Sequence, residues 1–151
     1  MEIKEKDENL SIVNEISILY KKKILGKVEG SKTVFNYLKG IYENAMDIRE
    51  MSVVMFLNRN HKIMGHYILS VGGLHGTVID SKLIFGIALK TLTSYIIISH
   101  NHPSGNLKPS QQDDLLTQKI KKMGEILEIP LLDHLILTDE GYYSYADEGN
   151  L

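Results

Sequence analysis

The 151-residue sequence contains no cysteine. This absence excludes disulfide bonds, thiolate zinc sites, thiol catalysis and iron–sulfur clusters, because each of them needs a cysteine sulfur. A metal ion bound by this protein must therefore be held by nitrogen and oxygen atoms.

Long apolar runs and an excess of one charge sign are also missing. No run approaches the ~20 apolar residues of a membrane span, and the charged residues after Met1 lack the apolar core of a signal peptide. We therefore expect a cytoplasmic location and no membrane partner. With 17 basic and 19 acidic residues, the net charge is −2, so the sequence lacks the excess of positive charge that would indicate binding to nucleic-acid phosphates. Nothing in the sequence specifies an oligomeric state.

The length suits one domain with a full hydrophobic core. We interpret residues 1–30 as an N-terminal extension, in which the partly alternating segment 10–20 is compatible with an edge strand. Residues 31–151 then form the domain.

Hydrophobic periodicity predicts helices and strands in alternation. The 3.6-residue stripes and capping residues predict helices from Ser31, from Asp80 to about Leu92, and from Ser110 to about Leu127, with Ser31 and Asp80 as caps. Runs rich in β-branched residues predict strands at 51–57, 63–71, 95–99, 131–137 and 142–146, the first two forming a hairpin. This pattern indicates an α/β or α+β fold with a mixed sheet between helices.

The segment from Ser99 to Asp113 contains the chemically informative residues. His100 and His102 lie two residues apart at the end of a buried strand, so their side chains project from the same face if the strand geometry continues. Asp113 lies in the first turn of the helix that follows Ser110. These two imidazoles and one carboxylate predict a site for one zinc ion, although such ligands accept several divalent metals.

The Ser110-x-x-Asp113 spacing has a second interpretation. It is also the spacing of a capping box, in which Ser110 caps the helix and the acid bonds back to the cap. On that fragment alone, capping is the better interpretation, and Asp113 cannot give the same lone pairs fully to a cap and to a metal ion.

Three protein ligands leave a fourth position for water, which distinguishes catalytic from structural zinc. Bound zinc lowers the pKa of water to about 7 and polarises a carbonyl. A carboxylate must still accept a proton, and spacing does not select it among nineteen acids.

The pattern His-x-His, seven residues, Ser-x-x-Asp resembles the motif of the JAMM (MPN-plus, or JAB) metalloproteases. The sequence from His100 to Gly105, together with Leu132-Asp-His-Leu135 and Tyr142-Tyr-Ser-Tyr145, resembles the bacterial RadC-type branch. The resemblance covers roughly residues 31–151.

The resemblance implies a twisted mixed β-sheet flanked by helices, similar to the cytidine-deaminase architecture. It implies one Zn²⁺ held by His100, His102 and Asp113, with Ser110 donating to the developing oxyanion and Glu50 acting as general acid/base. The implied activity is hydrolysis of an amide or isopeptide bond in a protein or peptide.

Two departures from the RadC pattern are visible. RadC-like proteins usually carry a helix-hairpin-helix module, which the roughly thirty preceding residues cannot hold. Many relatives have His-Pro-Arg-Glu before the middle helix, where this sequence reads Val78-Ile-Asp-Ser-Lys-Leu83.

Other functions and roles remain to be weighed. A non-catalytic interaction or DNA-repair accessory domain is the alternative function, although such scaffolds usually lose the metal ligands. The Cys-containing signature of zinc nucleobase deaminases and the His-Glu-x-x-His signature of helical zinc proteases are both absent. We expect His134 to be a hydrogen-bonded core residue, or a residue that orients a ligand or the loop, rather than a fourth metal ligand.

Overall fold

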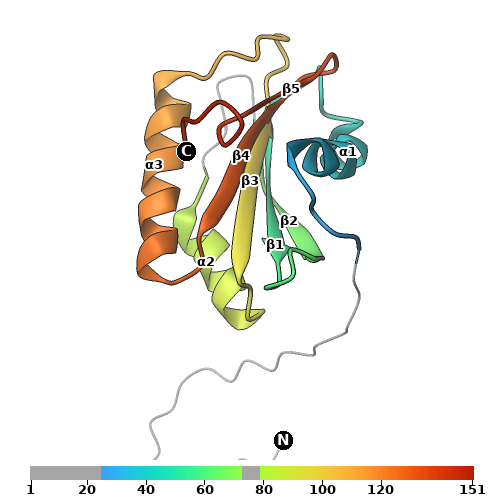
Figure 1. The fold of residues 1–151 in the computed structure, drawn as a ribbon. Helices are drawn as coiled ribbons and strands as arrows, with labels where there is room; N and C mark the ends of the chain where they lie inside the picture. The colour runs from blue at the N-terminus through green and yellow to red at the C-terminus, as the bar shows by residue number, and fades with distance from the viewer. Residues whose placement is uncertain (1–24, 73–78) are drawn as a thin grey trace, which may run out of the picture.

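The computed structural model describes residues 25–72 and 79–151, so the edge strand considered at 10–20 lies outside the described residues (Figure 1). The described elements, in chain order, are α1 (Ser31–Tyr42), β1 (Met51–Leu57), β2 (Ile63–Val71), α2 (Ser81–Lys90), β3 (Tyr95–Asn101), α3 (Gln111–Ile126), β4 (Leu131–Leu137) and β5 (Tyr142–Ser144).

The strands form one mixed sheet in the order β2-β1-β3-β4-β5. The β3–β4 pair is parallel and the other three neighbouring pairs are antiparallel. A parallel pair needs a crossover connection, which α3 provides. The central strand β3 is therefore hydrogen-bonded along both edges.

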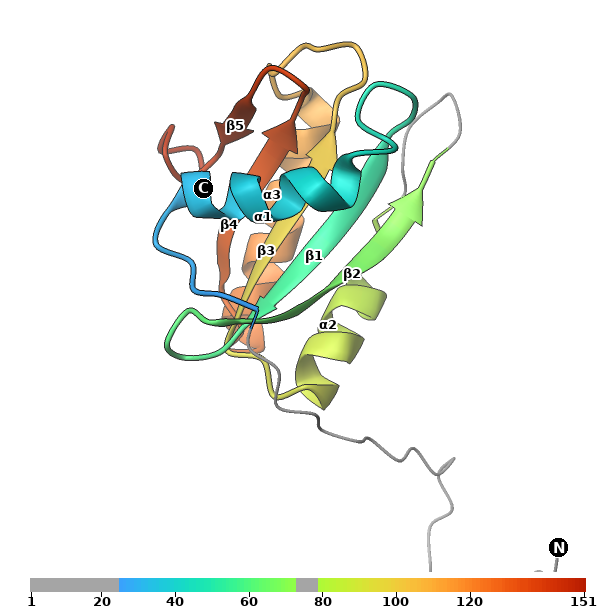
Figure 2. The ribbon, with the colours of Figure 1, turned by 90° about the vertical axis from the view of Figure 1, so that its right-hand side faces the viewer.

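Helices cover both faces of the sheet (Figure 1). One core cluster packs α1 against residues of β1, β3 and β4 that include Val53, Ile97 and Leu135, and α1 crosses this face in Figure 2. The other cluster packs α2 and α3 against residues that include Val54 and Ile98. The fold class predicted from the sequence, a mixed sheet flanked by helices, is confirmed.

The helix boundaries confirm one predicted cap and correct another. Asp80 accepts a hydrogen bond from the backbone N–H of Lys82 and caps α2 as predicted. Ser31 does not cap α1: Gly30 occupies the N-cap position, and the Ser31 hydroxyl bonds to Asp147 and Tyr142 instead. Partners distant in sequence thus decide the role of this serine.

Three further boundaries differ slightly from expectation, and one of them is the end of β5, which lies at Ser144 rather than at residue 146. The helix α2 ends at Lys90 rather than near Leu92, which has a φ of 54° that no right-handed helix contains. The strand β3 runs past Ser99 to Asn101, because β1 and β4 continue to pair with it on both sides. Within residues 25–72 and 79–151, no helix has both the length and the apolar character needed to cross a membrane.

Candidate metal centre

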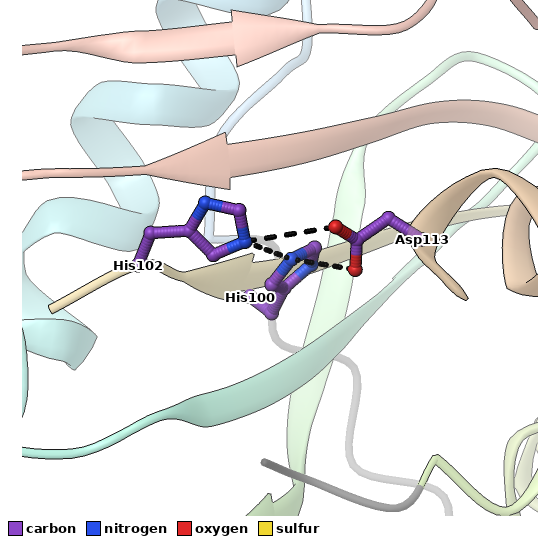
Figure 3. A group of neighbouring side chains, drawn as sticks. All are labelled: His100, His102 and Asp113. Atoms are coloured by element: carbon purple, nitrogen blue, oxygen red, sulfur yellow. Dashed lines mark hydrogen bonds and ion pairs between the residues drawn. The ribbon is translucent and has the colours of Figure 1, made fainter. Parts of the chain in front are cut away.

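His100, His102 and Asp113 meet where β3 ends and α3 begins (Figure 3). The Nε2 atoms of the two histidines lie 3.0 Å apart. Asp113 Oδ1 lies 3.1 Å from His100 Nε2, and its Oδ2 lies 3.6 Å from His102 Nε2. The structure therefore brings the three residues predicted as ligands together on one face of the strand end.

The chemistry and spacing of these donors fit a zinc ion. Two imidazole nitrogens and a carboxylate oxygen are ordinary zinc ligands, and donors bound tetrahedrally at about 2.0–2.1 Å lie roughly 3.3 Å from one another. His100 Nε2 lies 3.0 Å from His102 Nε2 and 3.1 Å from Asp113 Oδ1, and both distances are close to that value. The side chains thus need little rearrangement to share one ion.

The carboxylate of Asp113 serves the helix cap and the candidate metal site with different oxygens. Its Oδ2 accepts hydrogen bonds from the Ser110 backbone N–H at 2.7 Å and the Ser110 hydroxyl at 2.6 Å, while the Asp113 N–H donates to Ser110 Oγ at 3.1 Å. This is a complete capping box. The capping interpretation of Ser110-x-x-Asp113 is therefore confirmed, and because Oδ1 remains directed at His100, it does not conflict with the predicted metal site.

The ionisation of Asp113 follows from its surroundings. Burial alone would raise the pKa of its carboxyl group, but the neighbouring imidazoles of His100 and His102 and the hydrogen bond from the Ser110 hydroxyl outweigh burial and hold the pKa well below its usual value. Asp113 is therefore a carboxylate at any physiological pH.

The ring of His102 is oriented by its own loop. Its Nδ1 lies 2.6 Å from the carbonyl oxygen of Asn106, which can only accept, so Nδ1 carries a proton and Nε2 faces the other ligands. Gly105 closes this loop with a φ of 79° and donates its N–H to the His102 carbonyl.

The His102 pKa is raised, chiefly by the Asp113 hydrogen bond and also by the Asn106 carbonyl and the charge of Glu50, against the opposing effect of burial. A proton on Nε2 and a metal ion would compete for the same position.

Glu50 lies immediately before β1 and is half-buried. Its charge acts on His102, but it does not belong to the group of three close ligand atoms. Its carbonyl oxygen accepts the Gly72 N–H at 2.8 Å. The acid/base role implied by resemblance remains a prediction, as does the oxyanion role of Ser110, whose hydroxyl here donates to Asp113.

Asn101 is a buried residue whose contribution the sequence reasoning missed. Its Oδ1 accepts from the Met51 N–H at 2.7 Å, and its Nδ2 donates to the carbonyls of Arg49 at 3.0 Å and Met46 at 2.8 Å. These bonds hold the backbone on both sides of Glu50. The signal was available in principle, because alternation along a strand directs the middle residue of His-Asn-His to the opposite face.

His134 is completely buried and contacts His100 with its ring, and it is not part of the ligand group. Its side chain contacts His100 from the buried side, and its role in orienting a ligand remains a prediction.

Comparison with known proteins adds an independent line of argument. A family profile described as "RadC-like JAB domain" matches residues 28–150. A UPF0758 protein of Flavobacterium johnsoniae is 43% identical over 125 residues, which are 83% of this chain and 54% of the relative.

A second UPF0758 protein, from Porphyromonas gingivalis, is 48% identical over 99 residues, covering 65% of this chain and 44% of the relative. Another, from Thermotoga maritima, is 35% identical over 125 residues, covering 83% and 55%. The chain thus spans about half the length of the relatives it matches, and their names state no activity. The extent of the family match and these identities show that the chain belongs to the RadC-like JAB domain family.

Proposed function

We propose that this domain is a zinc-dependent hydrolase of amide or isopeptide bonds in a protein or peptide substrate. The observation that carries the proposal is the convergence of His100 Nε2, His102 Nε2 and Asp113 Oδ1 at one strand end. A bound zinc ion supplies a Lewis acid and an activated water. The JAB fold supports this reading because its superfamily includes hydrolases.

The residues of the chain divide the work in this proposal. His100, His102 and Asp113 would hold the ion, with the His100 ring contacted by buried His134 and the His102 ring oriented by the Asn106 carbonyl. Glu50 accepts a proton from the attacking water and returns it to the leaving amine. Its electrostatic effect on His102 supports this role, because it places the charge of Glu50 within electrostatic range of the site. The Ser110 hydroxyl, which donates to Asp113 in this structure, would turn from Asp113 to stabilise the developing oxyanion.

Elemental analysis is the first test, with untagged wild-type protein compared with the His102→Ala and Glu50→Gln variants. We expect about one zinc ion per chain in the wild type. The His102→Ala variant should lose the metal, and Glu50→Gln should keep it.

The second test is turnover of peptides and isopeptide-linked conjugates by the zinc-loaded proteins. The wild type should hydrolyse a substrate that Glu50→Gln cannot. Reconstituted wild-type protein that binds no metal would contradict the hydrolase and leave a non-catalytic interaction or DNA-repair accessory domain. Full turnover by Glu50→Gln would contradict only the acid/base role of Glu50 and not the hydrolase activity.

A further inference from the structure

A chain of buried hydrogen bonds runs from His100 away from the candidate metal site. His100 Nδ1 lies 2.9 Å from His134 Nε2, and His134 Nδ1 lies 2.6 Å from the Thr117 hydroxyl oxygen. That hydroxyl lies 2.7 Å from the backbone carbonyl oxygen of Asp113. His134 and Thr117 are completely buried. We call His134 and Thr117 the relay.

The direction of each hydrogen bond follows from the last acceptor. A carbonyl oxygen can only accept, so the single hydroxyl hydrogen of Thr117 points at Asp113. The Thr117 oxygen must then accept from His134, which places a proton on His134 Nδ1. A threonine that donates to the carbonyl four residues earlier is an ordinary feature of helices.

His134 is neutral in this arrangement. Its ring is completely buried, and its two nitrogens lie against His100 and the Thr117 hydroxyl rather than against a carboxylate, so neither contact offsets a charge on the ring. A neutral ring with a proton on Nδ1 has a lone pair on Nε2. That lone pair accepts from His100, so the proton of His100 lies on Nδ1 and its own Nε2 is free.

We propose that the relay formed by His134 and Thr117 fixes the tautomer of His100, so that the Nε2 lone pair always faces His102 and Asp113. Both residues are positioning residues for metal binding, and this inference rests on the metal site of the proposed function. The opposite tautomer would place a hydrogen atom where the ion must bind.

The relay ties three elements of the fold into one closed arrangement. His100 lies in β3, His134 in β4, and Asp113 and Thr117 one turn apart in α3. The carboxylate of Asp113 faces one side of the His100 ring, and its backbone carbonyl ends the chain of bonds on the other side. A single helix turn therefore determines both the ligand geometry and the proton position.

The test compares Thr117→Val, which removes the hydroxyl with little change in shape, with Thr117→Ser, which keeps it. Tyr42→Phe is the matched control, because it removes a buried hydrogen bond to Ser99 on the opposite face of β3. Zinc affinity is measured by competition with a chromophoric chelator. The tautomer of His100 is read from ¹⁵N chemical shifts of the metal-free protein, about two pH units above the usual imidazole pKa.

We expect His100 to carry its proton on Nδ1 in the wild type, in Thr117→Ser and in Tyr42→Phe. In Thr117→Val the His134 Nδ1–H loses its acceptor, the tautomers of both rings redistribute, and zinc affinity falls about 10- to 100-fold. Thr117→Ser and Tyr42→Phe should keep the wild-type affinity.

The outcomes separate the relay from the proposed function. A proton on His100 Nε2 in the wild type, or unchanged affinity in folded Thr117→Val, overturns the relay even if zinc binds and hydrolysis occurs. The predicted tautomer in a wild type that binds no zinc contradicts the hydrolase and leaves the relay standing. If Thr117→Val does not fold, the wild-type tautomer and the Thr117→Ser affinity still decide the matter.

Discussion

The two faces of β3 begin alike and end differently. Ile96 and Ile98 face α2 and α3, and Ile97 faces α1, so both faces are apolar in the first half of the strand. Beyond Ile98, one face continues to His100, whose Nε2 is directed at Asp113. The other continues to Ser99 and Asn101, whose polar atoms all bond to neighbouring segments.

The two faces of the strand end therefore carry residues of different roles: candidate metal ligands on one face and a structural asparagine on the other. The Asn101 amide is satisfied entirely by the backbone around Glu50, so nothing remains with which it could bind a ligand. The Nε2 atoms of His100 and His102 face only each other and a carboxylate. One strand end thus presents the candidate metal ligands on one face, and on the other it anchors the backbone around the predicted acid/base Glu50.

The largest effect on stability is expected at Asn101, on the face of β3 whose side chains anchor neighbouring segments. Asn101→Asp would set a second acceptor against the carbonyls of Arg49 and Met46, in a position with no exposure to water. We expect the free energy of unfolding to fall by about 3 kcal/mol or more. Urea unfolding in the presence of a chelator measures this free energy. A loss well below this value would contradict the structural role that distinguishes the Asn101 face from the face with the candidate metal ligands.

The matching substitution on the face with the candidate metal ligands is His102→Asn. Without metal we expect stability to change by less than about 1 kcal/mol, because the ring is only partly buried. Zinc at about 100 times its dissociation constant should stabilise the wild type by about 2.7 kcal/mol and leave the variant unaffected. Thermal unfolding with and without zinc tests this. Equal zinc-dependent shifts in both proteins would remove His102 from the ligand set.

Acidification should lower the stability of the folded protein because of the buried ring of His134. The pKa of His134 is lowered by burial, so below about pH 6.5 the unfolded chain binds a proton that the folded protein excludes. Stability should therefore fall from about pH 6.5 to 5, by up to about 1.4 kcal/mol per pH unit. His102, whose pKa is raised, is protonated in both states there and adds no slope, while Asp113 acts only at lower pH.

Metal-free His134→Gln should show a shallower dependence over the same range. This comparison also separates the effect of His134 from that of His66, whose pKa is lowered by burial as well. Parallel pH profiles for the two proteins would contradict the assignment.

The smallest effect concerns the helix caps. Ser110→Ala and Asp80→Ala each remove one N-cap acceptor, and each should cost about 1 kcal/mol of stability. Only Ser110→Ala should also weaken zinc binding, because Ser110 holds the Asp113 carboxylate. Chemical unfolding and chelator competition measure the two quantities. Equal zinc affinities would mean that Asp113 needs no support from its cap.

Local patterns in the sequence were sufficient to predict most elements and the meeting of His100, His102 and Asp113. Period-two alternation and a short loop into a helix are local properties, so they survive folding. The failures involve partners distant in sequence. Ser31 bonds to residues near the C-terminus instead of capping α1, and β3 extends because two neighbouring strands pair with it.

Two features of the site also lay beyond sequence reasoning. The division of the Asp113 carboxylate depends on where its two oxygens point, and no spacing rule contains that information. The bonds from His134 to His100 and Thr117 join three separate elements. Only the packing of α3 across the β3–β4 pair brings them together.

The pairing of β3 along both edges limits where this domain tolerates insertions and deletions. A one-residue slip within the strand would exchange its two faces, sending Asn101 toward α3 and the histidines toward α1. Residues 103–109 follow the last paired position and precede the cap of α3. Because these seven residues separate His102 from Ser110 and the Asn106 carbonyl among them orients the His102 ring, the strand and this loop should both keep a constant number of residues among relatives.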